Sequence, residues 1–181
     1  MTKDELIEEI RAAFKNVRLE DGVGLWEGQG LDDYADNETM LKLRKKDERN
    51  NWENITYEDL VDCQSSLSFF DAKGMRFCLP KFLIFDILAD EIFKEKGLYS
   101  PDVLFTLSYN LNEVYQENRM SLLDSKQIEV VIHFLTYKLN EIVLKHKTYS
   151  IDYGSSMDTV FSDKDYIELN NTINEWRRKL I

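Results

Sequence analysis

Apolar residues recur every three or four positions over much of the chain, which is the spacing of one face of an α-helix. At the N-terminus, Thr2 with Glu5 matches the capping-box pattern that begins many helices. An apolar stripe at helical spacing then follows, made of Leu6, Ile10, Ala13, Phe14 and Val17. The pattern predicts an amphipathic first helix.

The middle of the chain contains several helix start and stop signals. Thr56 with Asp59 matches another cap, and Asp71 is placed to cap a short helix that runs through Phe77. Pro80 suits the first turn of the next helix, where its missing N–H is not needed. We expect that helix to end near Gly97 and, because it is apolar nearly all round, to lie at the centre of the fold.

The C-terminal third predicts three more helices. Residues 100–102, Ser-Pro-Asp, combine a cap, a first-position proline and an acid near the positive end of the helix dipole. Residues 124–127 begin the longest expected helix, which runs to about Lys147. A linker at 148–160 separates it from a last helix that is capped by residues 162–165.

Only two prolines and seven glycines interrupt the sequence, so long helices are favoured throughout. We expect an all-α protein, a single compact domain over residues 1–181 with six or seven helices. Residues 19–41 hold seven acids and no base, and we expect this segment to be irregular, with a short helical turn near 31–34. Short extended pieces at 18–19 and 148–153 stay open.

The net charge of the chain indicates which classes of partner it can bind. The net charge of −11 repels phosphate backbones and anionic membrane surfaces, so we expect no nucleic acid and no membrane partner, while basic proteins stay open. No apolar run approaches the ~20 residues of a membrane span, and the N-terminus lacks a signal-peptide layout. We expect a cytoplasmic protein of bacterial style.

The nucleophilic and metal-binding residue types are sparse. Cys63 and Cys78 fit neither a disulfide framework nor a zinc spacing, and their apolar surroundings indicate buried, inert thiols. His133 and His146 are 13 residues apart on one expected helix, roughly 20 Å at helical rise, so they cannot share a metal. His133 lies in an apolar run beside Phe134, and we expect its side chain to be satisfied or partly buried rather than catalytic.

The glycine-rich segment Gly22–Gly30 does not have the spacing of a phosphate-binding loop, and its flanking acids would repel a phosphate. We expect a flexible loop. Asp32, Asp33, Asp36 and Glu38 lack the order of a calcium loop, which indicates a solvated acidic face. We therefore expect no metal and no cofactor.

Aromatic residues accompany this acidic segment. Trp26, Tyr34 and Trp52 flank the acids, and tryptophan and tyrosine dominate the energetics of protein interfaces. Packing of these rings over the core is the other interpretation, and the sequence leaves both open. If they form an interface, the candidate partner-binding residues are Trp26, Asp32, Asp33, Tyr34, Asp36 and Trp52.

The densest motif is Leu67–Pro80, in which large apolar residues surround Asp71, Gly74 and Arg76. Capping explains Asp71, and a hydrogen-bonded or snorkelling side chain would explain Arg76. The alternative is that Asp71 and Arg76 form a charged pair facing a cleft.

This block also carries a resemblance to a known family. The pieces are Leu-Ser-Phe-Phe-Asp at 67–71, Gly-Met-Arg-Phe at 74–77 and Leu-Pro at 79–80, with Asp47 and Trp52 before them and Ala13-Phe14 to Val17 earlier. The chain resembles an uncharacterised bacterial family of unknown function in these motifs. Phe70 and Met75 replace other apolar residues, and Cys78 stands where an aromatic is common. The resemblance implies no activity.

Two functional hypotheses follow. The first is a non-catalytic protein-interaction protein, of an immunity or accessory type, whose acidic and aromatic N-terminal half attracts a basic partner. The second is an enzyme with a carboxylate and arginine site near Asp71 and Arg76. No catalytic constellation is present in the sequence, so we favour the first. The sequence does not define the oligomeric state.

Overall fold

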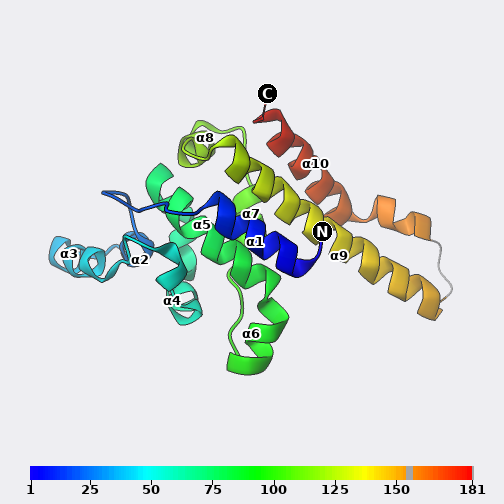
Figure 1. The fold of residues 1–181 in the computed structure, drawn as a ribbon, viewed down its shortest axis with the longest axis horizontal. Coiled ribbons are helices and arrows are strands. Elements are labelled where there is room, and N and C mark those ends of the chain that lie inside the picture. Colours follow the sequence, from blue (N-terminus) through cyan, green and yellow to red (C-terminus); the bar gives the residue numbers. More distant parts are fainter. Residues whose placement is uncertain (154–156, 181) are drawn as a thin grey trace. The chain divides into compact units, whose positions relative to one another are not determined.

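The computed structural model describes residues 1–153 and 157–180, and all regular elements in these ranges are helical (Figure 1). The α-helices are α1 (Lys3–Ala13), α2 (Leu25–Asp32), α3 (Asn37–Lys46), α4 (Tyr57–Asp62), α5 (Ala72–Ile87), α6 (Ala89–Lys96), α7 (Val103–Ser108), α8 (Val114–Met120), α9 (Ser125–Tyr153) and α10 (Lys164–Arg178). The 3-10 helices are η1 (Trp52–Asn54), η2 (Gln64–Ser68) and η3 (Met157–Ser162). The all-α prediction is confirmed.

The predicted count of six or seven helices is wrong, because the described residues form ten α-helices, eight of them with seven or more residues. The chain forms two compact units: Lys3–Leu123, and Asp124–Ile181 together with Met1–Thr2. A single domain over the whole chain stays a prediction. Among the described residues, no helix combines the length and the apolar character needed to cross a membrane.

The core of the first unit is built around α5. Eleven of its sixteen residues are buried, as expected for a helix that is apolar nearly all round. The amphipathic helix α1 packs on α5 through its predicted stripe, with Leu6, Ile10 and Phe14 fully buried. Both thiols lie in this core, so the expected burial of Cys63 and Cys78 is confirmed, and neither forms a disulfide.

One boundary prediction fails at α5. Pro80 lies inside a continuous helix rather than in the first turn of a new one. Proline removes one helical N–H, but the surrounding core fixes the backbone and overrides this local signal. The chain bends instead at Leu88, between α5 and α6, and Gly97 ends α6 with φ of 69°, as its position predicted.

Most predicted caps are present, some shifted by one or two residues. Thr56 and Asp59 form a complete capping box at α4, and the Asp71 side chain caps α5 by accepting from the N–H of Gly74. The cap of α7 is Asp102 rather than Ser100, and that of α10 is Asp163. The capping residues in the sequence therefore predicted the first residues of these helices to within one helical turn.

The expectation of an irregular segment at 19–41 is wrong. The glycine-rich stretch, expected to be a flexible loop, forms α2, and α3 follows after a short turn. The glycines serve close packing: a Cβ on Gly28 would lie 3.0 Å from the Cβ of Ser66, and one on Gly30 would lie 2.5 Å from Cδ1 of Leu43. Helix α2 is thus held between η2 and α3.

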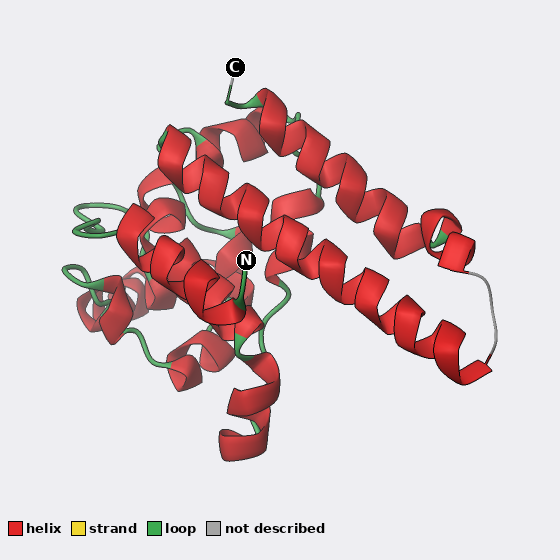
Figure 2. Cartoon of the chain, turned by 45° about the vertical axis from the view of Figure 1, so that its right-hand side comes forward, coloured by secondary structure: helices red, strands yellow, loops and turns green. Residues whose placement is uncertain are grey.

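In the second unit, the long helix α9 and the C-terminal helix α10 lie side by side (Figure 2). At the predicted start of α9, Asp124 and Gln127 cap each other. The Asp124 side chain accepts from the N–H of Gln127, and the Gln127 side chain accepts from the N–H of Asp124. Residues 148–153 continue the helix, so neither the linker nor an extended piece begins there. Residues 154–156 of the expected linker lie outside the described residues.

Candidate functional site

The first turn of α2 is capped by a buried carboxylate. Asp47, directly after α3, is 8% exposed, and its Oδ1 accepts from the N–H of Trp26 at 2.7 Å. Burial raises the pKa of Asp47 to about 6, although the N–H groups of Trp26 and Glu27 and the charge of Arg49 act to lower it. A Cβ on Gly24 would overlap the carboxylate. The protein's own anion therefore fills the anion-binding end of this helix.

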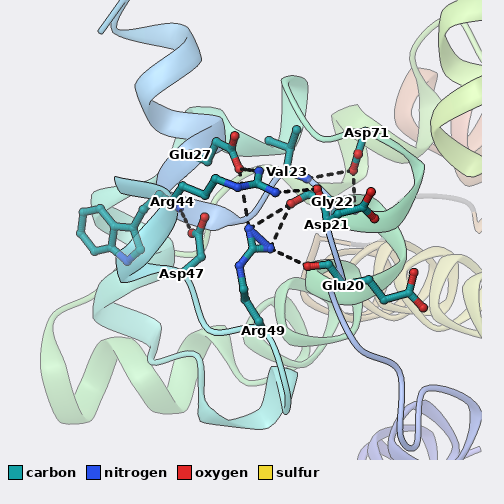
Figure 3. Close-up of polar contacts among 11 residues, drawn as sticks. Glu20, Asp21, Gly22, Val23, Glu27, Arg44, Asp47, Arg49 and Asp71 are labelled. Carbon is teal, nitrogen blue, oxygen red and sulfur yellow. Dashed lines mark hydrogen bonds and ion pairs between the residues drawn. The ribbon is translucent and has the colours of Figure 1, made fainter. Parts of the chain in front are cut away.

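Two arginines hold the loop that leads into α2, as Figure 3 shows. Arg44 Nη2 donates to Asp21 O at 2.8 Å, and Arg49 Nη1 donates to Glu20 O at 2.8 Å and to Gly22 O at 3.3 Å. Three consecutive carbonyl groups thus point at guanidinium groups. Glu27 balances the charge, with Oε2 2.5 Å from Arg44 and 4.0 Å from Arg49.

Helix α5 holds the same loop from another side. Asp71 Oδ1 accepts from the N–H of Gly74 at 2.7 Å and from that of Val23 at 3.1 Å. Lys73 pairs with Glu20 and Asp21, both at 2.6 Å. A phosphate loop would present free N–H groups, whereas here those of Val23 and of the first turn of α2 donate to carboxylates. This glycine-rich stretch is a structural junction.

The candidate partner-binding residues do not all share one surface. Trp52 is 2% exposed and its indole N–H donates to Phe14 O at 2.9 Å, so this ring belongs to the core. Trp26 is half-buried at the start of α2, with Lys46 Nζ 2.9 Å from its ring centre. Trp52 thus packs within the core, and Trp26 packs against the Lys46 side chain.

The other four candidates come together at the turn between α2 and α3. Tyr34 is 95% exposed and has φ of 53°, while Asp36 caps α3 by accepting from the N–H of Thr39 at 2.8 Å. Asp33 accepts from the Gln29 side chain at 3.1 Å, and Asp32 lies beside it, half-buried. We call the α2–α3 tip the set Leu31, Asp32, Asp33, Tyr34, Asp36, Glu38 and Leu41.

Helix α3, which carries part of this tip, has no buried residue among its ten. Met40 and Leu43 approach Gly30 on α2, whereas Leu41 is 61% exposed and Leu31 is 40% exposed. The hydrogen bonds of Asp36, Arg44 and Asp47 fix both ends of α3. The tip is therefore an ordered projection with apolar and acidic side chains directed to solvent.

The alternative site contains one side chain that local structure does not explain. Arg76 is half-buried on α5, and its Nε is buried without a hydrogen-bond partner in the described part of the chain. Asp71, in contrast, is engaged as the cap of α5 and as a partner of Val23. The described contacts do not pair Asp71 with Arg76.

Arg119, which the sequence did not single out, is the most buried arginine of the first unit. It is 5% exposed and donates to the carbonyls of Leu67 and Phe70 and to Gln116 Oε1. Burial lowers its pKa. Nothing in the local sequence marks it, because three polar residues of α8 precede it and arginines are usually exposed.

The two histidines lie on α9, in the second unit. His133 is exposed, so of the two expectations for it, a satisfied or a partly buried side chain, only partial burial is wrong. His146 Nε2 lies 3.0 Å from Asp163 Oδ2, and the N–H of Tyr166 and this histidine together lower the pKa of Asp163. Among the described residues, no group of three or more His, Cys, Asp or Glu side chains is arranged to hold a metal ion.

Comparison with known proteins identifies the family. The model of DUF6714, a family of unknown function, matches residues 2–156, so the chain belongs to this family. The expected membership in a family of unknown function is confirmed. No curated protein and no solved structure shows significant similarity to the chain.

Proposed function

We propose that this member of a family of unknown function is a non-catalytic protein-binding protein and that the α2–α3 tip is its binding surface. One observation carries the proposal: α3 buries none of its ten residues, and the turn that leads into it holds Tyr34 95% exposed. A helix of this length is marginal alone in water, and most helical stability in proteins comes from packing an apolar face. Leu41 is available for such packing against a partner.

Fixed geometry favours binding. The caps and the Arg44–Glu27 pair hold α3 before any partner arrives, which reduces the conformational entropy lost on association. The exposed Tyr34 is the kind of aromatic side chain that anchors protein interfaces, and the exposed Leu41 adds apolar area that a partner can bury. The tip therefore combines anchor residues with a preorganised backbone.

The charge of the tip defines the chemistry of the partner. Residues 31–38 contain four acids and no base, within a chain of net charge −11. A basic surface would be steered toward it, and the association rate would fall as salt rises. We infer a basic protein partner.

The test begins by capturing partners from the source cell with the wild-type protein, then measures binding of each purified candidate. Tyr34→Asn/Leu41→Ser removes the anchors, and asparagine tolerates the positive φ at position 34. The control is Phe93→Ser/Tyr99→Asn, a second pair of exposed rings. We expect the tip variant to raise Kd at least about tenfold and the control to leave it unchanged.

A charge variant separates steering from anchoring. Asp32→Asn/Asp33→Asn leaves Asp36 and its cap intact and is expected to lower the association rate and its salt dependence. If every captured partner binds the tip variants as tightly as the wild type, or if no partner is captured, the proposal fails.

The runner-up function, an enzyme with a site near Asp71 and Arg76, is supported only by the unpartnered Nε of Arg76. Its proposed carboxylate has a sufficient structural role, because Asp71 Oδ1 accepts two backbone hydrogen bonds. We therefore retain the binding protein as the conclusion.

A further inference from the structure

A second set of exposed apolar side chains lies where α7 leads into α8. Its members are all more than half exposed: Phe105 at 53%, Tyr109 at 53%, Val114 at 71% and Tyr115 at 56%. We call these four residues the α7–α8 corner. They come from two short helices of the first unit and from the turn between them (Figure 1).

The rings of the corner are held in place. Phe105 and Tyr109, four residues apart, stack with centroids 4.8 Å apart and planes 19° apart. The Tyr115 hydroxyl donates to Ser68 O at 2.6 Å. Gln116 Nε2 donates to Tyr109 O at 2.9 Å, which joins α8 to the end of α7. A ligand would therefore meet rings that have already lost much of their freedom.

The charged residues of the segment that carries these rings all have one sign. Residues 102–118 contain three acids, Asp102, Glu113 and Glu117, all exposed, and no lysine or arginine. The next residue, Arg119, is buried against backbone carbonyls and lies under the Tyr115 ring at 5.1 Å. Within residues 102–118, the corner thus offers aromatic rings and carboxylates to solvent, with no lysine or arginine in the same segment.

This combination fits a guanidinium group. Arginine stacks on aromatic faces and pairs with carboxylates through its planar fork, which a lysine ammonium cannot do in the same way. The chain contains a natural contrast, because the exposed pair Phe93 and Tyr99, with centroids 4.6 Å apart, encloses a segment of mixed charge with Lys94, Glu95 and Lys96. Aromatic exposure alone is therefore distinguishable from aromatic exposure within an acidic field.

We propose that the α7–α8 corner is a docking surface for an arginine-bearing segment of a protein partner. The surface is separate from the α2–α3 tip, and the proposal does not depend on the function assigned to that tip.

The test is an NMR titration of the isotope-labelled full chain with a short peptide of alternating glycine and arginine, at constant ionic strength. Peptides with lysine or glutamate in place of arginine complete the series. We expect saturable amide shifts centred on residues 102–117, with weaker binding of the lysine peptide and no binding of the glutamate peptide. Phe105→Ala/Tyr109→Ala should raise Kd roughly tenfold, the loss expected for two exposed cation–π contacts.

The matched control is Phe93→Ala/Tyr99→Ala, which removes the other exposed ring pair and should change Kd by less than about twofold. Circular dichroism of each variant establishes that it is folded. The proposal is overturned if shifts spread over all acidic residues or fall on the tip alone. Equal weakening by both double variants, or equal affinity for the arginine and lysine peptides, overturns it as well.

Discussion

Replacing Asp47 by asparagine tests whether burial or hydrogen bonding dominates at the start of α2. The carboxylate is 8% exposed, accepts from the N–H of Trp26, and has one oxygen that is buried without a hydrogen-bond partner in the described residues. Burial raises its pKa from 3.8 to about 6. The folded protein therefore binds this proton more tightly than the unfolded chain does.

The sign of the pH dependence follows from linkage. Because the folded pKa is the higher one, the stabilisation from protonated Asp47 is complete below pH 3.8 and is lost as the pH rises through about 6. The full shift corresponds to about 3 kcal/mol at 1.36 kcal/mol per pKa unit. Between pH 5 and pH 7.5 the expected loss is about 1 kcal/mol.

The assay is urea unfolding of the wild type and Asp47→Asn at pH 5 and pH 7.5, followed by far-UV circular dichroism. Asparagine keeps an acceptor for Trp26 but cannot ionise. The free energy of unfolding of the variant, minus that of the wild type, should be larger at pH 7.5 than at pH 5 by about 1 kcal/mol. This double difference cancels the contributions of all other titrating groups. Asp62→Asn, at an exposed position of α4, controls for the loss of one charge.

A double difference of zero would refute the argument from burial. The opposite sign would mean that the N–H groups of α2 and the charge of Arg49 outweigh burial, so that the folded pKa lies below 3.8. An NMR titration of the Asp47 carboxyl carbon would then report that lower value directly.

Four further substitutions test packing and backbone hydrogen bonds within the first unit, each by urea unfolding. Gly74→Ala should lower the free energy of unfolding by about 3 kcal/mol, because the added Cβ would overlap Val23 O. Gly97→Ala has open space around the added Cβ, so only its left-handed backbone conformation is unfavourable, and the free energy of unfolding should fall by about 1 kcal/mol. Arg119→Met should lower it by about 3 kcal/mol by leaving two buried carbonyls without a donor; an effect below 1 kcal/mol would contradict that role. Trp52→Phe should lower it by about 1 to 2 kcal/mol through the lost N–H donor, and no change would show that water replaces it.

The sequence predicted what depends on neighbouring residues. Thr56 and Asp71 cap helices through side chains that reach only three residues ahead, and Gly97 ends α6 through its own backbone. The stripe on α1 follows from spacing within one helix. Each of these signals lies within a short stretch of sequence, so it can be interpreted without knowing the fold.

The failures share a different cause. Gly28 and Gly30 indicate a loop by propensity, but Ser66 and Leu43 approach them closely in the folded chain, and tertiary contact outweighs the local cost of glycine in a helix. The helix boundary predicted at Pro80 is wrong for the same reason, because the core contacts of α5 keep the helix continuous through the proline. Among the candidate site residues, Trp52 lies in the core because its N–H meets Phe14 O, a contact 38 residues distant that no spacing indicates.

The Leu67–Pro80 block holds both proposed binding surfaces in place. Asp71 accepts a hydrogen bond from Val23, in the loop that leads into α2, and Gly74 lies against the carbonyl of Val23. At the start of the block, Arg119 of α8 donates hydrogen bonds to the carbonyls of Leu67 and Phe70. The block thus connects the helix that carries the tip with the helix that carries the corner. Asp71 and Gly74 are engaged with backbone groups and Lys73 with the carboxylates of Glu20 and Asp21, whereas Nε of Arg76 is buried without a hydrogen-bond partner in the described part of the chain. Tyr34→Asn/Leu41→Ser and Phe105→Ala/Tyr109→Ala should therefore change binding with little change in stability, whereas substitutions at Gly74 or Arg119 should change stability first.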